Sequence, residues 1–562
     1  MGIRSRVLFG ATLLSTITLL LVFSLSDYSR PSRTRVIDTW HDVKDKVQDN
    51  LPANNGTPTR PKAKPLDPTS CNEDLSFLAE YKLTPSIRYA SRQIIAVQEA
   101  SSGRPSVTDI KEPLFPELVS TNLNASKAFK PEKCLSPLYL SVAQPPHAPE
   151  DAIDASSLMF GMQTTLSRLH DTVKHLERWL AYSQAKLHAI VQEKEGEPAN
   201  DAEMVILQEV FKNRHMDALV RHPLNKEHVF QQRYFSIVES LYEARTPNTK
   251  WIILVDDDTF YPNMKRLMAA LDKFDHTQPM YVGAISEDWN AIQRYGIMGF
   301  GGAGIYLSVP MAEIIVAHKE ECNDHTRTSA GDITVFDCIY RFTEVKLTPL
   351  VGAHQMDLYK NQGGVYESGR QFVALHHWKG ESEIPIEKMH TIFDLCQDCF
   401  LQRWKFPNEL LLSNGYSITH YPYGHLSGRE PPRAGALKGT IVQPAPPPPP
   451  PPPSPTAEPV KEGEEPKPPS PPPPPGPPKL EAVDLFRLEQ TWYDHGKFDV
   501  EHSIGPTRPG LEEWEKITFR LEDVIKGTGG GLKQVYVKRG SEGEEDMVMV
   551  LDWRSGTLAE QT

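Results

Sequence analysis

The sequence lacks any dense cluster of lysine and arginine, and its acidic residues outnumber its basic ones. Asp and Glu total 73 against 60 for Lys and Arg, which gives a formal net charge of −13. Because proteins bind nucleic-acid phosphates through basic patches, this balance argues against a nucleic-acid partner. Cysteine is scarce, with 6 in 562 residues, and no internal repeat is evident. The length allows one large domain or two to three ordinary ones.

An uncharged run extends over residues 7–25, after Arg4 and Arg6. Its length is near the lower limit for a membrane-spanning helix, and basic residues before such a run keep that end cytoplasmic. We therefore expect residues 1–6 to be a cytoplasmic tail and the run to be a signal anchor. The rest would be lumenal, as in a single-pass type II protein of the Golgi or ER membrane. The alternative is a cleaved signal peptide ending near Ser24–Ser26.

Either route leads to an oxidising lumen, where six cysteines are most simply three disulfides. Six cysteines allow about fifteen pairings. Proximity in the sequence favours the pairs Cys71–Cys134, Cys322–Cys338 and Cys396–Cys399. The last pair could instead be a redox or zinc motif, but only His390 lies near it as a further ligand, so we prefer a structural disulfide.

Composition divides the rest of the chain. Residues 26–150 are polar and punctuated by proline, which is typical of a stem. Over residues 151–425, short strand-like segments alternate with helical ones, which predicts an α/β sheet with both faces covered. The expected strands are Leu158–Met162, Lys186–Val191, Asp217–Val220, Trp251–Val255 and Met280–Ile285. The expected helices are Leu166–Ala181, Ala202–Lys212, Glu227–Ala244, Asn263–Phe274 and Val309–Lys319.

The C-terminal part contains a proline-rich insertion. Residues 443–478 are nearly pure proline with Ser, Glu and Lys, so we expect an extended polyproline spacer. Residues 479–562 form an extension that is β-rich in its last part. There Gln534–Lys538 and Met547–Trp553 alternate around a polar turn and predict a hairpin. Because sequence typical of folded protein lies on both sides of the proline tract, we expect the tract to be inserted within one C-terminal unit.

Three consecutive carboxylates end the expected strand Trp251–Val255: Asp256, Asp257 and Asp258. Like charges side by side repel, so this arrangement needs open water or a neutralising cation. The end of a strand at the edge of a sheet is where α/β proteins bind ligands. Oxygen ligands select Mn²⁺, Mg²⁺ or Ca²⁺, and no calcium-loop spacing follows here. The sequence therefore predicts a divalent cation at this strand end.

Two enzyme classes place carboxylates in this way. Phosphatases of the haloacid-dehalogenase type end a strand in Asp-x-Asp, with a threonine two residues after the second Asp. Here Thr259 follows Asp258 directly and Phe260 occupies the required position, so the match is imperfect. Glycosyltransferases use Asp-x-Asp to hold a divalent ion on the diphosphate of a nucleotide sugar. A phosphatase with Asp256 as its nucleophile stays open as an alternative.

Six short motifs, in order along the chain, resemble those of Fringe-like glycosyltransferases of family 31. They are Leu158–Thr165 with Arg168, Val255–Asp258, Tyr281–Gly283, Gly301–Gly304, Ala330–Thr334, and Leu350–His354 with Asp357. Gln163 stands where the family has lysine, and Gly331 where it has the first Asp of Asp-Asp-x-Thr. The Cys322/Cys338 bracket and the pair His376-His377 are similar to the plant and fungal branch.

The resemblance covers roughly residues 157–423 and implies a fold of the GT-A type. Such a fold has a mixed, mostly parallel sheet with helices on both faces. Here it would be preceded by the transmembrane helix and the stem, and followed by the β-rich C-terminal segment.

The resemblance also implies roles for individual residues. Asp332 would be the catalytic base that takes the proton of the acceptor hydroxyl. A helix N-cap is its structural alternative. Asp256, Asp258 and His354 would hold Mn²⁺ or Mg²⁺, with His376 as the alternative ligand. Contacts with the donor would come from Thr164, Thr165, Arg168, Asp256, Asp257, Gly302 and Ala303.

We therefore expect a lumenal, inverting, metal-dependent glycosyltransferase. It would move a sugar from a UDP-sugar to a hydroxyl of a glycan or glycoprotein, with a β-1,3 linkage as the family implies. Trp289 and Tyr295 could stack on an acceptor sugar, although loop aromatics more often pack against the protein. The remaining alternatives are an inactive carbohydrate-binding lumenal protein and an interaction protein built on the stem and the proline tract.

Overall fold

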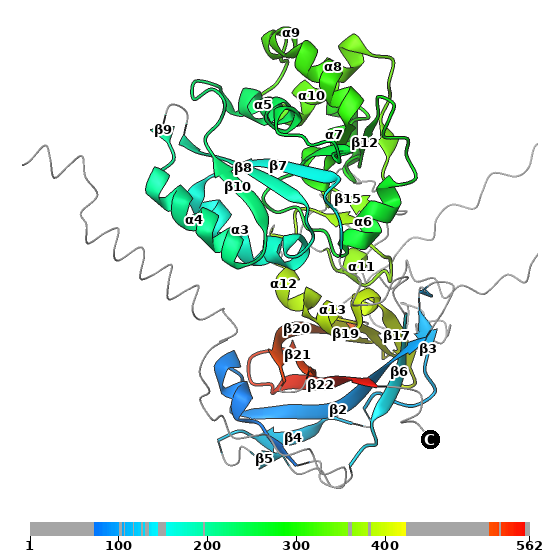
Figure 1. Ribbon diagram of the computed structural model, residues 1–562. Coiled ribbons are helices and arrows are strands. Elements are labelled where there is room, and N and C mark those ends of the chain that lie inside the picture. The colour runs from blue at the N-terminus through cyan, green and yellow to red at the C-terminus, as the bar shows by residue number, and fades with distance from the viewer. Residues whose placement is uncertain are drawn as a thin grey trace, which may run out of the picture. The chain divides into compact units, whose positions relative to one another are not determined.

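The structure is a computed structural model with two large β-sheets (Figure 1). It describes residues 72–99, 104–105, 107–115, 117–124, 128–129, 134–143, 153–194, 197–357, 362–379, 384–422, 516–527 and 530–556. All of them belong to one compact unit, Leu66–Thr562. The expected anchor and the proline tract lie outside the described residues. Within the described part, no helix has the length and apolarity needed to cross a membrane.

The first sheet has eight strands in the order β10-β8-β7-β11-β13-β12-β14, with β9 beside β8. The strands are β7 Leu158–Thr164, β8 Lys186–Lys194, β9 Glu197–Pro198, β10 Asp217–Arg221, β11 Trp251–Leu254, β12 Tyr281–Gly283, β13 Ile305–Ser308 and β14 Thr348–Pro349. Strands β10, β8, β7 and β11 run parallel, whereas β13 is antiparallel to both β11 and β12. The sheet is therefore mixed, as expected.

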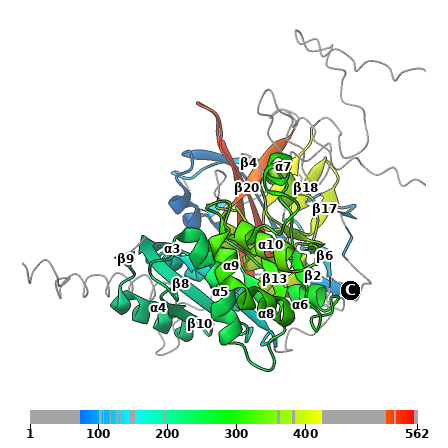
Figure 2. The same cartoon turned by 90° about the horizontal axis from the view of Figure 1, so that it is seen from above.

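Helices cover both faces of this sheet (Figure 2). They include α3 Leu166–Leu180, α4 Asp201–Asn213, α5 Phe230–Glu243, α6 Met264–Leu271, α8 Val309–Ala317 and α10 Gly331–Phe342. On β7, Phe160 packs against Trp179 of α3, with ring centroids 5.2 Å apart. A Cβ on the next residue, Gly161, would lie 2.2 Å from Ile237 of α5. Because alternate residues of a strand face opposite sides, α3 and α5 cover opposite faces.

The sheet topology brings four segments to one edge. Strands β7 and β11 are parallel and end there, at Thr164 and Leu254. Strand β13 is antiparallel to β11, with Ile305 opposite Leu254, so it begins at the same edge. The short helix η2 Gly301–Ala303 leads into β13. The small parallel pair β15 Ala353–His354 and β16 Ala374–Leu375 joins them through a bridge between Phe260 and Leu375.

Two of the expected disulfides are confirmed. Cys322 is bonded to Cys338, which ties the short helix α9 Lys319–Asp324 to α10 within the core between α5, α8 and the sheet. Cys396 is bonded to Cys399, so this pair is a disulfide in the structure. Cys134 is also disulfide-bonded, and its expected partner Cys71 lies outside the described residues.

The second sheet has ten strands in the order β3-β17-β18-β19-β20-β21-β22-β2-β4, with β6 beside β2. They are β2 Ser86–Glu99, β3 Thr108–Asp109, β4 Val119–Asn122, β6 Leu138–Ala143, β17 Arg403–Phe406, β18 Leu410–Ser413, β19 Ser417–His420, β20 Ile517–Lys526, β21 Leu532–Lys538 and β22 Asp546–Gly556. The predicted hairpin is confirmed as β21 and β22, with Gln534 opposite Leu551. Strands β19 and β20 pair directly, in agreement with a proline-rich insertion inside one unit.

The structure corrects the expectation of a stem for the described residues between 72 and 143. Strand β2 runs parallel to β22 from Ile87 to Val97. Its side chains Ile87 and Tyr89 are buried in a core with Val535 and Val550. Strands β2, β3, β4 and β6 of this segment are therefore integral parts of the second sheet.

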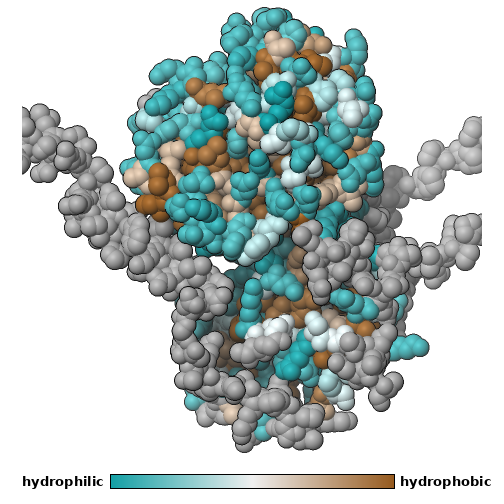
Figure 3. Space-filling model, in the orientation of Figure 1, coloured by the Kyte–Doolittle hydropathy of each residue, from teal (hydrophilic) through white to brown (hydrophobic). Residues whose placement is uncertain are grey.

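Most of the visible face of the described residues is hydrophilic, and hydrophobic residues appear on it singly or in small groups (Figure 3). Such scattered exposure is ordinary for a globular protein. The visible face of the described residues therefore shows no extended hydrophobic surface (Figure 3).

Candidate functional site

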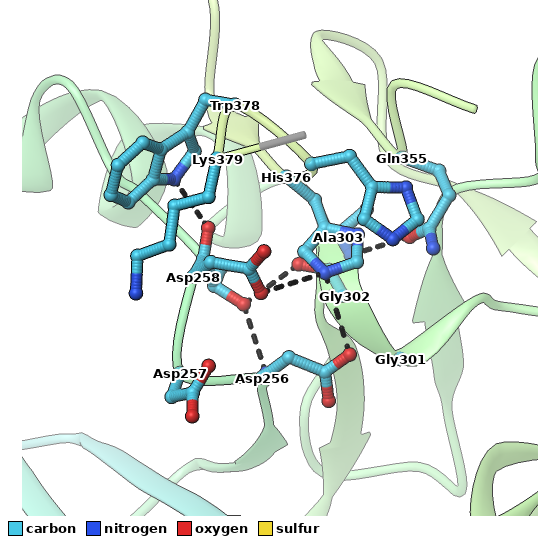
Figure 4. Close-up of polar contacts among 12 residues, drawn as sticks. Asp256, Asp257, Asp258, Gly301, Gly302, Ala303, Gln355, His376, Trp378 and Lys379 are labelled. Atoms are coloured by element: carbon cyan, nitrogen blue, oxygen red, sulfur yellow. Dashed lines mark hydrogen bonds and ion pairs between the residues drawn. The ribbon is translucent and has the colours of Figure 1, made fainter. Parts of the chain in front are cut away.

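Two segments far apart in the sequence supply a cluster of metal-ligand atoms. Nε2 of His376, which follows β16, lies 3.0 Å from Oδ1 of Asp258 and 3.5 Å from Oδ2 of Asp256. One ligand atom from each of the three residues lies within 4.8 Å of the other two. Figure 4 shows Asp256 and Asp258 bonded to the same imidazole. Two carboxylates and an imidazole suit a divalent ion such as Mn²⁺, which would take the place of the proton they share.

The three groups are strongly coupled. Burial lowers the pKa of His376, but its hydrogen bond to Asp258 and the charges of Asp258 and Asp256 outweigh this and raise the pKa above its usual value. Burial raises the pKa of Asp258, but His376 moves that pKa well below its ordinary range. Burial raises the pKa of Asp256; the charge of His376 opposes this rise, and the neighbouring carboxylates add to it. The cluster therefore favours positive charge between its carboxylates.

His354, the ligand first expected, does not belong to this cluster. Its Nδ1 lies 3.0 Å from Oε1 of Glu287, a carboxylate in a residue only 2 % exposed. Strands β15 and β16 are parallel, and the amide of His376 donates to the carbonyl of His354 at 3.2 Å. Among the described residues, the structure thus groups the alternative ligand His376, and not His354, with Asp256 and Asp258.

Asp257 is 3 % exposed, and its carboxylate is occupied within the protein. Nε of Arg168 donates to Oδ2 at 2.6 Å, and Nη2 donates to Oδ1. The hydroxyl of Thr164 donates to Oδ2 at 2.6 Å. Thr165 caps α3 by accepting from the amide of Arg168 at 3.3 Å. These four expected donor-binding residues hold one another in place, and their contact with a donor stays a prediction.

Gly302 leaves the space in which the ring of His376 lies. A Cβ at this position would lie 2.0 Å from Cε1 and Nδ1 of His376, so the imidazole rests directly on the glycine backbone. The hydroxyl of Thr259 donates to the carbonyl of Gly302 at 2.7 Å and accepts from the amide of Asp256 at 2.9 Å. Gly302, which was expected to contact the donor, makes room for a histidine. These two bonds occupy the hydroxyl of Thr259, the threonine considered for the phosphatase motif.

Asp332 lies in the first turn of α10, beside η2. Its Oδ1 accepts from the amide of Ile333 at 2.8 Å and its Oδ2 from the amide of Gly301 at 3.3 Å. The N-cap of the helix is Ala330, so the N-cap interpretation of Asp332 was wrong. Burial raises the pKa of Asp332 to about 6; the bond from Gly301 opposes this rise and the charge of Asp256 adds to it. A carboxylate with such a pKa, held by two amides, can act as a general base.

Ser286 and Glu287, which were not expected from the sequence, contact residues of two of the sequence motifs. Nδ1 of His377 lies 2.9 Å from Oδ1 of Asp357, and the hydroxyl of Ser286 donates to Oδ2 of Asp357. The amide of Asp357 in turn donates to Glu287 at 3.4 Å. The sequence signal was the acidic segment after β12, which a search for residues at strand ends could have found. These residues fix the two loops that carry the histidines.

Two further residues position the site through the backbone. The amide of Ala303, an expected donor contact, donates to Oε1 of Gln355 at 2.9 Å. The indole of Trp378 donates to the carbonyl of Asp258 (Figure 4). Tyr295, expected as an acceptor platform, instead packs against the buried cluster of Met298, Phe300 and Ile333, and the side chain of Trp289 lies outside the described part.

Comparison with known families gives one match. A family model described as a protein of unknown function, DUF604, matches residues 290–394. The matched segment contains Asp332, His354 and His376, and it spans less than half of the chain. No curated protein sequence matches the chain.

Several solved structures are similar to part of the chain. The apo crystal structure of mouse xyloside xylosyltransferase 1 has 13% identity, covers 34% of this chain and 84% of its own, and has a TM-score of 0.23. The Pyrobaculum calidifontis mannosyltransferase PcManGT, in complex with GDP-Man and Mn²⁺, has 8% identity, coverages of 40% and 64%, and a TM-score of 0.26. A glycosyltransferase involved in glycosylation of the major capsid of PBCV-1 has 11% identity, coverages of 42% and 99%, and a TM-score of 0.24.

All three of these solved structures are glycosyltransferases. Similarity at this level carries no argument about substrate or mechanism. The functional conclusion therefore depends on the geometry of the site.

Proposed function

We propose that the chain is a metal-dependent glycosyltransferase that moves a sugar from a nucleoside-diphosphate donor to a hydroxyl group. The observation that carries this proposal is the group formed by Asp256, Asp258 and His376, which lies at the same sheet edge as Asp332. The group offers one nitrogen and two carboxylate ligands within 4.8 Å of one another. This set holds a divalent ion and leaves positions for phosphate oxygens.

The two halves of the reaction fall to different elements. A divalent ion held at the end of β11 would neutralise charge on the departing nucleoside diphosphate. Asp332 on α10 would take the proton from the attacking acceptor hydroxyl, because its raised pKa matches a base working near neutral pH. The amides of Gly301 and Ile333 hold the carboxylate in one orientation. A base separate from the cation group is what a direct, inverting displacement requires.

We extend the proposal to the finer points that the family resemblance implies. The donor would be a UDP-sugar, the acceptor a glycan or glycoprotein, the cation Mn²⁺ or Mg²⁺ and the linkage β-1,3. The enzyme would act in the lumen of the Golgi or ER, held by the N-terminal anchor. These points are supported by the sequence motifs and the uncharged N-terminal run.

The test is release of UDP from a panel of UDP-sugars by the purified lumenal chain, with and without Mn²⁺, in wild type and Asp332→Asn. We expect Mn²⁺-dependent turnover of at least one donor, and a loss of about 100-fold or more in Asp332→Asn with UDP binding retained. Full activity of Asp332→Asn would show that the base is another residue. Absence of turnover together with absence of metal-dependent UDP binding would contradict the enzyme itself.

A further inference from the structure

The charges around the carboxylates at the end of β11 can be matched one by one. The guanidinium of Arg168 forms a two-pronged ion pair with Asp257. A divalent ion on Asp256 and Asp258 would be balanced by those two carboxylates. The occupied group would thus carry no surplus positive charge, although a departing nucleoside diphosphate is strongly negative. A further cation is needed at the site to attract it.

Lys379 is a cation near the site that is not paired with any of these three carboxylates. Among the described residues it forms no ion pair, and the hydrogen-bond partner of its Nζ is a neutral hydroxyl, Oγ1 of Thr172, at 3.1 Å. Burial lowers the pKa of Lys379, and the charges of Asp257 and Asp258 oppose this lowering. Figure 4 shows its side chain extending beside Asp258, on the side of Asp257.

The surroundings hold the lysine in this position. Its neighbour Trp378 is anchored by the indole bond to the carbonyl of Asp258 and by the ring of His175, with centroids 4.4 Å apart. Nζ of Lys379 lies 5.2 Å from the centroid of the Trp378 ring. Thr172 is fixed in turn, because its hydroxyl donates to the carbonyl of Arg168 at 2.7 Å. The ammonium group is thus placed by two elements, α3 and the segment after β16.

We propose that Lys379 binds the diphosphate of the donor and of the departing nucleotide. An ammonium group is a compact cation that suits phosphate oxygens. Its bond to Thr172 leaves two of its three N–H groups for a ligand. This inference rests on the proposed function and adds to it a phosphate-binding residue outside the metal cluster.

The test uses two probes, UDP and inorganic pyrophosphate, titrated by calorimetry into the full lumenal chain with Mn²⁺. We compare wild type with Lys379→Met, Lys379→Arg and the control Lys174→Met, which removes a lysine of α3 that pairs with Glu387 instead. We expect Lys379→Met to weaken UDP and pyrophosphate about tenfold or more, with Lys379→Arg intermediate and the control within about twofold. Mn²⁺ affinity, measured by electron paramagnetic resonance, should not fall.

Unchanged affinity for UDP and pyrophosphate in Lys379→Met would overturn the inference. A parallel fall in Mn²⁺ affinity would overturn it as well, because the substitution would then act on the metal cluster. Lack of Mn²⁺-dependent UDP binding in wild type would instead remove the proposed function on which the inference rests.

Discussion

At the scale of single residues, each carboxylate of Asp256–Asp258 has its own surroundings. Asp257 is neutralised by Arg168 and is closed to solvent. Asp256 and Asp258 both face His376, and the side chain of Asp256 is more exposed to solvent than that of Asp258. The three like charges can stand side by side because Arg168 pairs with the central carboxylate and His376 lies between the outer two. The central carboxylate serves the structure, and the outer two are left for a cation.

The pH dependence of the reaction follows from Asp332. Burial raises its pKa to about 6, and a base works only when it is ionised, so the rate should fall as pH drops through this value. Because the charge of Asp256 contributes to the rise, a cation there would shift the fall to lower pH. We expect the acidic limb of kcat/KM at or below about pH 6, with a slope of one. A limb above pH 7, or the same limb in the residual activity of Asp332→Asn, would contradict the assignment.

The carboxylates of the site could be predicted from the sequence. The sequence could not decide whether His354 or His376 lies beside them. The three Asp residues directly follow an apolar strand, so the local pattern places them at the sheet edge. The choice between His354 and His376 depends on how β15 lies against β16, two strands of two residues each. Single-sequence patterns contain little information on such short pairings. Glu287 escaped notice because its importance arises only from that same arrangement.

At the scale of elements, the site depends on the close approach of η2 and β16. Gly302→Ala would place a Cβ 2.0 Å from the buried ring of His376, and the ring could not stay where it is. We expect Mn²⁺ affinity to fall about tenfold or more, with a loss of stability of about 1–3 kcal/mol. Gly301→Ala is the matched comparison, since its Cβ would meet the hydroxyl of Tyr234 at 2.3 Å.

Both substitutions should lower the unfolding temperature, but only Gly302→Ala should also weaken Mn²⁺ binding. Equal Mn²⁺ affinity in Gly302→Ala and wild type would show that the imidazole is not a ligand.

The elements of the first sheet were predictable because they alternate regularly and have clear ends. The expected strand Leu158–Met162 and helix Leu166–Ala181 correspond to β7 and α3 within two residues. Strand β16 contains only two residues, because its flanking residues turn away to form the loops of the site. His377 even has a φ of +46°, which a strand residue does not adopt.

At the scale of the whole molecule, segments from three parts of the sequence build the second sheet. Strand β2 comes from the N-terminal part, β17–β19 from the middle, and β20–β22 from beyond the proline tract. Such long-range pairings leave no local signal, so composition alone suggested a stem for the segment that contains β2. The alternation of Ile87 and Tyr89 in β2 was present, but it was hidden within polar surroundings.

A buried ionic group links the middle of the chain to its C-terminal part. Glu367 is 1 % exposed; it pairs with Lys516 and accepts from the hydroxyl of Ser417 at 2.7 Å. Removing one partner of a buried pair leaves the other charge uncompensated, so we expect Glu367→Gln to destabilise the protein by about 3 kcal/mol. Urea unfolding followed by tryptophan fluorescence measures this.

The control is Glu522→Gln, which removes a more exposed pair with Arg539 at 3.2 Å in the same sheet. Its effect should stay below about 1 kcal/mol. Similar losses for the two variants would show that Glu367 does not hold the C-terminal strands in place.

The central claim is that β11 and the segment after β16 together hold a cation on which a nucleoside diphosphate binds. Calorimetric titration of UDP into wild type, His376→Ala and His354→Ala, each with and without Mn²⁺, tests it most directly. We predict binding of UDP to wild type only with Mn²⁺, retained in His354→Ala and lost in His376→Ala. UDP binding that is equally strong with and without Mn²⁺ would contradict the account. So would UDP binding that is retained in His376→Ala and lost in His354→Ala.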